Sequence, residues 1–308
     1  MPLLLLGATG FLGGRIARRL TADGVVFVPV SRSLGTDLRD PAQFRAVFEA
    51  HPGIDVVLHA AAFVGGIRFG LAHPGEIYHH NALMNAHLFE LAREFGVRRI
   101  VNPISNCSYP RDLDRAFREE AWWDGPLDES VLAYGFVRKA SYVQSWAYHR
   151  QYGLETITLL VPNMYGPGDH FDEVRSHALG ALVMRIARAE RLGQPEVVVW
   201  GSGRPVREWL YVDDGVEAML RAAAVPHTPD PINIGIGSGV SIRELAEMIR
   251  DAIGYRGRLV FDPSQPDGAP YKVMDVERCD AVFGWRPRTA LAEGLAETVR
   301  WYREHARE

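Results

Sequence analysis

Near its N-terminus the chain reads Leu3-Leu4-Leu5-Leu6-Gly7-Ala8-Thr9-Gly10-Phe11-Leu12-Gly13. A continuous apolar run such as the four leucines is typical of a parallel strand that is covered on both faces. The turn that follows contains three glycines, and apolar residues then recur at helical spacing as far as Leu20. Such a turn lets backbone N–H groups and the helix N-terminus approach a pyrophosphate. We therefore predict a dinucleotide-binding unit, because a tight turn alone does not need three glycines at this spacing.

Strands and helices alternate along the first half of the chain. Apolar runs predict strands at residues 25–30, 54–59, 99–101 and 154–161, and helical periodicity predicts helices at residues 42–50, 74–95 and 134–152. This alternation predicts an α/β fold with a doubly wound parallel sheet of the Rossmann type. We expect this domain at residues 1–162, with 207–235 returning to it, and mainly a smaller α+β substrate lobe at 163–308, including a helix at 242–253.

Composition excludes several classes of protein. Hydrophobic residues make up 47% and charged residues 23% of the chain, as in an ordinary globular protein. The formal net charge of −4 gives no general attraction to nucleic acid or to anionic membranes, and the leucine run is too short to cross a bilayer. Two cysteines, Cys107 and Cys279, do not make a disulfide framework, so we expect a cytoplasmic protein. No spacing of Cys, His and carboxylate residues indicates a metal site.

The end of the second predicted strand bears on the choice of dinucleotide. An acidic residue there would bind the ribose hydroxyl of NAD and repel the 2′-phosphate of NADP. The chain instead reads Ser31-Arg32-Ser33, without a carboxylate. NADP is therefore favoured, with Arg32 pairing with the phosphate, although Arg32 as a plain surface charge is the competing interpretation. Asp37 and Leu38, a few residues on, are expected to flank the adenine.

Ser105 and Cys107 follow the fourth predicted strand, and Tyr134 begins the segment Tyr134-Gly-Phe-Val-Arg138-Lys139. Further motifs are Ala60-Ala-Ala-Phe-Val-Gly-Gly66-Ile67, Ser105-Asn-Cys107-Ser-Tyr-Pro110, Pro162-Asn163-Met-Tyr-Gly-Pro167, Ser176-His177, Trp200-Gly-Ser-Gly203, Arg207-Glu208 and Pro266-Asp267-Gly-Ala-Pro-Tyr-Lys272. With these motifs, over essentially its whole length, the chain resembles the GDP-L-fucose synthases. These are extended short-chain dehydrogenases/reductases that act with NADPH as 3,5-epimerases and 4-reductases of GDP-4-keto-6-deoxymannose.

The resemblance implies a role for each candidate catalytic residue. A ketone at C4 acidifies the protons on C3 and C5, and Cys107 and His177 are the implied base and acid that exchange them. Ser105 and Tyr134 are implied donors to the enolate oxygen, and Tyr134 also delivers a proton when hydride passes from NADPH to C4. Without the resemblance, a lone Cys after a strand is a small buried hydrophobe, and a lone His is a surface or core residue.

The resemblance also implies which residues line the binding sites. Those against the NADP(H) cofactor are Gly7, Thr9, Gly10, Phe11, Leu12, Gly13, Arg32, Asp37, Leu38, Ala60, Ala61, Ala62, Tyr134, Arg138, Val161, Asn163 and His177. Those against the nucleotide sugar, for which GDP is the favoured nucleotide, are Asn163, Arg185, Trp200, Arg207, Asp267 and Lys272. Arginine forks and a lysine suit a diphosphate, but Arg185 and Arg207 as solvated charges and Trp200 as a core residue are the alternative. A homodimer is also implied.

One position departs from the family pattern. The family has a lysine four residues after the tyrosine, whereas this chain has Arg138 there and a lysine one place later, at Lys139. Residues four apart share a helix face, while a residue five apart points about 100° further round. Three outcomes are open: Arg138 replaces the lysine, a local shift brings Lys139 in, or reduction is impaired while epimerisation survives.

Two alternative functions also stay open. One is an epimerase or 4-ketoreductase for a related nucleotide-linked deoxysugar or heptose. The other is a regulator that binds NADP without catalysis, against which Tyr134, Cys107 and His177 argue, since a sensor has no use for a proton-transfer pair.

Overall fold

The computed structural model describes residues 2–113, 115–172, 176–265 and 267–306. Its main body is a six-stranded sheet with the order β10-β5-β4-β3-β1-β2. The strands are β1 (Leu3–Leu6), β2 (Phe27–Val30), β3 (Val56–His59), β4 (Arg99–Ser105), β5 (Glu155–Val161) and β10 (Ile232–Asn233). Every neighbouring pair in it runs parallel. The predicted doubly wound parallel sheet is confirmed.

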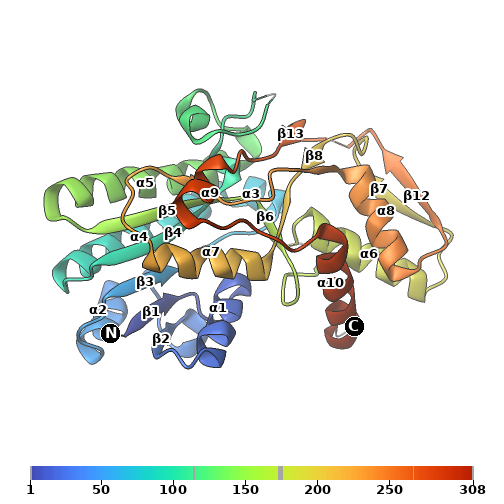
Figure 1. Cartoon of the computed structure of the whole chain (residues 1–308). Helices are drawn as coiled ribbons and strands as arrows, with labels where there is room; N and C mark the ends of the chain where they lie inside the picture. Colours follow the sequence, from blue (N-terminus) through green and yellow to red (C-terminus); the bar gives the residue numbers. More distant parts are fainter. Residues whose placement is uncertain (1, 114, 173–175, 266, 307–308) are drawn as a thin grey trace.

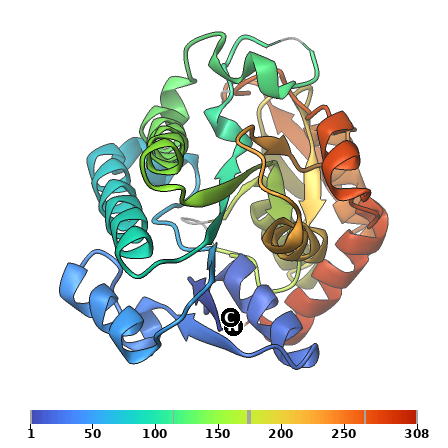
Figure 2. The ribbon, with the colours of Figure 1, turned by 60° about the vertical axis from the view of Figure 1, so that its left-hand side comes forward.

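Helices cover both faces of this sheet. One face carries α2 (Pro41–Ala50), α4 (Pro74–Glu94) and α5 (Leu132–Tyr152), and the other carries α1 (Phe11–Ala22) and α7 (Val212–Ala224) (Figure 1). In the turned view, α4 and α5 lie side by side (teal and green in Figure 2). Leu4 and Leu6 pack in the core under α2 and α4, whereas Leu5 packs with α1 and α7. Side chains alternate across a strand, so a strand buried on both faces is apolar throughout.

Two strand boundaries differ from the prediction. The second strand begins at Phe27, because Val25 and Val26 are exposed and the Val25 amide closes the end of α1 by donating to Leu20. The fourth strand continues past residue 101 to Ser105, paired with β5 along its whole length. Pro103 argues against a strand in the sequence. It is tolerated because β3 pairs with β4 only as far as Val101, so Pro103 has no partner on that side.

The second half of the chain forms a smaller lobe with its own core. Apolar residues of α6 (Ala178–Arg191), β7 (Glu196–Trp200), α8 (Ile242–Ile253) and α10 (Leu291–His305) pack together there. Its strand pairs are β7 with β12 (Arg258–Asp262), β6 (Asn163–Tyr165) with β9 (Trp209–Tyr211), and β8 (Val206–Arg207) with β11 (Val240–Ser241) and β13 (Tyr271–Lys272). The remaining helices are α3 (Ile67–Ala72) and α9 (Glu277–Phe283).

The chain order of the sheet reverses at β1, which lies between β2 and β3. In an open parallel sheet, the crevice beyond the carboxyl ends of the strands at such a switch point is the usual place for a ligand. Gly7 follows β1 there, and Ala60 follows β3 and donates its amide to Leu6. Among the helices in the described ranges, none is both long and apolar enough to span a bilayer.

Candidate active site

The glycine turn brings the ends of β1 and β3 into close contact. Gly7 has a φ of +80°, and a Cβ there would lie 2.7 Å from the carbonyl carbon of Ala60. A Cβ on Gly13 would lie 2.0 Å from the Gly7 oxygen. Thr9 and Gly10 are exposed, and Gly10 is the N-cap of the twelve-residue helix α1. Only glycine fits the inner side of this turn, which leaves the helix N-terminus open to a phosphate group.

Three hydroxyl groups meet where β2 ends. Thr9 Oγ1 donates to Ser31 Oγ at 3.0 Å, and Ser33 Oγ lies 2.7 Å from Thr9 Oγ1 and 3.1 Å from Ser31 Oγ. Arg32, between the two serines, is exposed. The predicted cofactor residues include Thr9 and Arg32 but omit Ser31 and Ser33, although their place beside Arg32 is visible in the sequence. Hydroxyls and a guanidinium can bind the 2′-phosphate of NADP, whereas a site for NAD would have a carboxylate at this position.

Asp37 supplies no free carboxylate nearby. The Arg39 guanidinium donates to both of its oxygens and, by that hydrogen bonding, holds the pKa of Asp37 at about 2. The pair cancels the negative charge that would repel a 2′-phosphate. Leu38, predicted to flank the adenine, is buried in the core under α2 and α4, and its carbonyl faces a ring nitrogen of His87 at 3.0 Å. Adenine contact by Leu38 stays a prediction.

β4 ends at Ser105, and the tight turn that follows carries Cys107. The Cys107 amide donates to Ser105 Oγ at 3.3 Å, and Ser108 Oγ donates to the Ser105 carbonyl at 2.7 Å. The first turn of α5 lies against this segment, since a Cβ on Gly135 would be 3.0 Å from the Cys107 oxygen. Tyr134 therefore lies beside Cys107. Sequence reasoning placed these groups in one crevice, and the structure brings them together.

The electrostatics of this cluster join four groups. Burial raises the pKa of the Tyr134 phenol, the Arg138 charge opposes that rise, and Cys107 adds to it. Burial also raises the pKa of the Cys107 thiol, against the charges of Lys272 and Arg138. Lys272 stands opposite Arg207 in the β13–β8 pair, and burial lowers the pKa of both. At neutral pH the site thus combines a protonated thiol and a protonated phenol with nearby cations.

Arg138 is turned into the protein interior. Its side chain is 2% exposed, and Nη2 donates to Asn102 Oδ1 at 3.3 Å and to the Pro103 carbonyl. Its Nε and Nη1 are buried and have no hydrogen-bond partner among the residues that the structure describes. The charge of Arg138 acts on Tyr134 and Cys107. Arg138 thus occupies the position expected for the family's lysine, as an enclosed guanidinium.

Lys139 does not enter the catalytic cluster. Its Nζ donates to the Trp122 carbonyl and lies 4.5 Å from the centroid of the Trp123 ring. The alternative in which a local shift brings this lysine to the tyrosine is therefore wrong. The reason is geometric, because the side chain one position after Arg138 leaves the helix on another face.

His177 is the N-cap of α6 and begins the smaller lobe's first helix. Burial lowers the pKa of its imidazole, and the neighbouring His170 lowers it further, which keeps the ring neutral at pH 7. A neutral imidazole can accept a proton, whereas the Cys107 thiol holds one. The pairing of His177 with Cys107 across the crevice stays a prediction.

A groove of the smaller lobe is lined by two of the predicted nucleotide-sugar residues, Arg185 and Trp200. The Arg185 guanidinium lies 5.0 Å from the centroid of the Trp200 ring. The groove is lined by Arg185, Arg188, Gln194, Glu196, Val197, Val198 and Trp200. Trp200 is 40% exposed, so the interpretation of Trp200 as a core residue is wrong. The two side chains thus form a cation–π contact at this groove.

Other predicted substrate residues have structural partners. The carboxylate of Asp267 accepts hydrogen bonds from the backbone amide of Ser202 at 2.6 Å and from the Ser202 hydroxyl at 2.7 Å. These two bonds close the turn after β7. Pro266, in the same motif, lies outside the described residues. Asn163 begins β6, just after Val161 at the buried end of β5. Asp128, which no sequence signal singled out, acts electrostatically on both Arg207 and Lys272.

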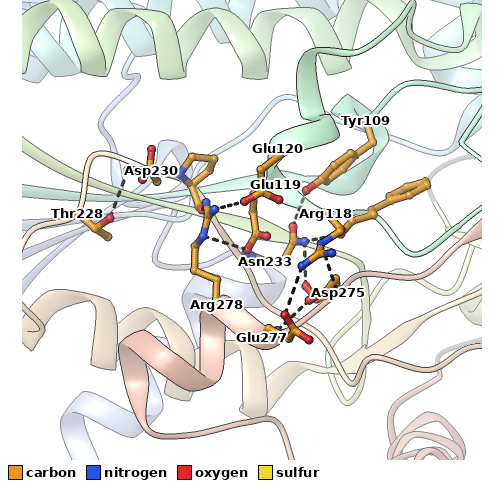
Figure 3. A network of polar contacts seen from close by, with 12 residues as sticks. Tyr109, Arg118, Glu119, Glu120, Thr228, Asp230, Asn233, Asp275, Glu277 and Arg278 are labelled. Atoms are coloured by element: carbon orange, nitrogen blue, oxygen red, sulfur yellow. Dashed lines mark hydrogen bonds and ion pairs between the residues drawn. The ribbon is translucent and has the colours of Figure 1, made fainter.

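A buried polar network fastens the segment that follows the catalytic turn (Figure 3). The Tyr109 hydroxyl donates to Asn233 Oδ1 at 2.7 Å, and the Asn233 amide group donates to the carbonyls of Phe117 and Asp275. Glu119 accepts from the Asn233 backbone amide at 2.9 Å. Asn233 of β10 thus anchors Tyr109, Phe117 and Glu119.

Comparison with known proteins agrees with this architecture. The profile of the NAD dependent epimerase/dehydratase family matches residues 3–235. The chain is 36% identical to probable GDP-L-fucose synthase 1 of Oryza sativa subsp. japonica, over 97% of this chain and 91% of the relative. It is 35% identical to GDP-L-fucose synthase of Escherichia coli strain K12, over 98% and 96%.

Among solved structures, a gdp-l-fucose synthetase from Naegleria fowleri bound to NADP has a TM-score of 0.89 at 25% identity, covering 98% of this chain and 94% of that one. The predicted resemblance is confirmed over nearly the full length. The protein is therefore an enzyme of the NAD dependent epimerase/dehydratase family, homologous to the GDP-L-fucose synthases.

Proposed function

We propose that this enzyme is an NADPH-dependent 3,5-epimerase and 4-reductase of a GDP-linked 4-keto-6-deoxy sugar. The observation that carries the proposal is the cluster at the end of β4. There the start of α5 packs against Cys107, the thiol raises the pKa of the Tyr134 phenol, and the charge of Lys272 opposes the rise in the pKa of the thiol. The relatives named GDP-L-fucose synthase supply the identity of the sugar and nucleotide.

The cofactor site fits NADP(H). The glycine turn cradles the pyrophosphate, because a side chain at Gly7 or Gly13 would collide with backbone. The hydroxyls of Thr9, Ser31 and Ser33, with Arg32, bind the 2′-phosphate. When bound, NADPH supplies the hydride that reduces C4 of the sugar.

The protein's own groups handle the protons. His177 and Cys107 exchange protons with C3 and C5 of the sugar. In the free enzyme the imidazole is neutral and can accept a proton, and the thiol is protonated and can donate one. Ser105 and Tyr134 donate hydrogen bonds to the oxygen on which negative charge develops. Tyr134 then delivers its proton to O4, and the Arg138 charge stabilises the phenolate that remains. Arg207, Lys272 and Arg185 bind the diphosphate.

A second candidate function is epimerisation with impaired reduction. The enclosed guanidinium of Arg138 favours it, because Nη2 is held by Asn102 and Pro103 and the other two nitrogens are buried. A compact ammonium and a planar fork are not interchangeable at such a site.

One experiment separates the candidates. The enzyme is incubated with GDP-4-keto-6-deoxymannose and NADPH in D₂O, and the 340 nm absorbance and deuterium at C3 and C5 are followed. The proposal requires both loss of absorbance and exchange. Deuterium exchange without loss of absorbance supports the second candidate, epimerisation with impaired reduction. In that case, a large rise in reduction rate for Arg138→Lys would show that Arg138 limits the reduction step. If no keto-sugar nucleotide gives either loss of absorbance or deuterium exchange, both candidate functions are contradicted.

The assembly is proposed to be a homodimer. Along α5, Leu132, Phe136, Val143 and Trp146 are about half exposed and fall on one side of the helix. A second copy of the same face would cover this stripe. Both cysteines are free, in keeping with the proposed cytoplasmic location. Analytical ultracentrifugation compares the parent enzyme with Phe136→Glu, which should sediment as a monomer if this face forms the dimer.

A further inference from the structure

We propose that Lys139 is a positioning residue, whose ammonium group fastens Trp122 to α5 so that Trp122 holds the catalytic turn Ser105–Ser108 in place. The inference rests on the proposed function for its kinetic consequence. It gives a role to the lysine that stands one place beyond the family position, which the proposed chemistry does not use.

The ammonium of Lys139 is enclosed by the segment that precedes α5. The residue is 4% exposed, and Nζ donates to the Trp122 carbonyl. Nζ also lies 4.5 Å from the Trp123 ring centroid and 5.5 Å from that of Trp122. Burial lowers the pKa of Lys139 to about 8. A carbonyl and two indole rings thus stabilise the cation.

Trp122 passes this restraint to the catalytic turn. Its side chain is fully buried, and the indole Nε1 donates to Ser108 Oγ at 2.9 Å. Ser108 Oγ donates to the Ser105 carbonyl at 2.7 Å, and Ser105 Oγ accepts from the Cys107 amide at 3.3 Å. A continuous series of hydrogen bonds therefore runs from α5 to the residue that carries the thiol.

The two ends of the segment are held by different parts of the fold. Its earlier part, around Phe117 and Glu119, is bound to Asn233 of β10 (Figure 3). Its later part, at Trp122, contacts α5 through Lys139 and through the Tyr142 ring, whose centroid is 5.2 Å away. If the Lys139 contact is lost, Trp122 loses its hydrogen bond to α5, and the indole that donates to Ser108 is held less firmly.

The test compares Lys139→Met, Lys139→Arg and Trp122→Phe. Methionine removes the charge at similar volume, arginine keeps a donor cation, and phenylalanine keeps a ring but removes the indole N–H. Arg118→Met is the matched control, because Arg118 lies on the same segment but is exposed and pairs with Glu277 at 3.3 Å. Melting temperature and circular dichroism are recorded for each variant.

We expect Lys139→Met to lower kcat for deuterium exchange by about 10- to 100-fold, the loss expected of a displaced catalytic group. KM and the Kd of NADPH should change less than about threefold, since neither site is touched. Lys139→Arg should recover most of kcat, and Trp122→Phe should follow Lys139→Met. The double variant should lose no more than the worse single variant, because both act through one path.

Alkylation of Cys107 by iodoacetamide gives a readout that needs no substrate. Its rate should change in Lys139→Met and Trp122→Phe but not in Arg118→Met. Unchanged alkylation and exchange in folded Lys139→Met would overturn the inference, as would failure of Lys139→Arg to recover kcat. If Lys139→Met does not fold, Trp122→Phe decides by the same readouts. If alkylation is altered in the variants but the parent enzyme shows no deuterium exchange, the proposed function is rejected and the inference about Lys139 stands.

Discussion

Arg138 donates from Nη2 to Asn102 Oδ1 at 3.3 Å, so the guanidinium that stands in the lysine position is held by a neighbouring strand rather than by a carboxylate. Its positive charge opposes the rise in pKa that burial causes at Tyr134. A mobile lysine would act on the same phenol from the crevice. The choice of arginine thus ties the acidity of the tyrosine to the packing of β4 against α5.

Arg138→Met should raise the Tyr134 pKa and slow reduction by at least about 100-fold, because the phenolate loses its counter-charge. Deuterium exchange should fall less, since it depends on Cys107 and His177. Stopped-flow absorbance at 340 nm and mass spectrometry of the sugar measure the two steps. Arg118→Met, at the surface, serves as control, and equal losses in both steps would contradict a role specific to Tyr134.

The thiol of Cys107 should react as a high-pKa cysteine. Since burial raises its pKa above the ordinary value of 9.0, alkylation should increase with pH and reach half its maximum above pH 9. Lys272→Met should move this midpoint upward, because Lys272 is the charge that opposes the rise most strongly.

Iodoacetamide rates from pH 7 to 11 provide the measurement for Cys107. A Cys279→Ser background isolates one thiol, and Cys279 is fully buried with a pKa raised by burial to about 12. A midpoint below pH 9, or one that Lys272→Met moves downward, would show that the thiol lies in different surroundings.

Gly13→Ala and Gly14→Ala form a matched pair in α1. A Cβ on Gly13 would lie 2.0 Å from the Gly7 oxygen, whereas one on Gly14 would be 3.8 Å from the nearest atom, the Ala8 oxygen. Gly13→Ala should weaken NADPH binding by about 100-fold or more as the turn opens. Gly14→Ala should bind normally and gain about 0.5–1 kcal/mol of stability, as alanine does in a helix. Fluorescence titration and thermal melts distinguish them, and similar affinities would refute the close approach.

Ser33→Asp should shift cofactor preference from NADPH towards NADH. The new carboxylate would stand within the hydroxyl cluster at Thr9 and Ser31, where it repels a 2′-phosphate and accepts from a ribose hydroxyl. We expect the ratio of Kd values to change by about 100-fold. Leu34→Asp is the control, because Leu34 is exposed and outside the cluster. An equal shift in both variants would mean that net charge, not the cluster, sets the preference.

Much of the architecture could be read from local patterns. The helix at 242–253 has the predicted bounds, and the glycine turn and the doubly wound sheet follow from periodicity and glycine spacing. These signals depend on contacts within a few residues, or on a strand being buried on both faces. The same signals place Ser105, Cys107 and Tyr134 after the fourth strand, where the crevice of such a sheet opens, whereas their catalytic roles are implied only by the resemblance.

Partners distant in sequence could not be predicted in this way. The charge of Lys272 acts on Cys107 only because β13 pairs with β8, far along the chain from β4. Lys139 and Arg138 are adjacent in sequence, yet one faces Trp122 and the other Asn102. A buried charge takes the orientation in which surrounding groups best offset its loss of hydration. Those groups come from segments that only tertiary packing brings together, so the sequence determined which chemical groups are present and the fold determined what each one faces.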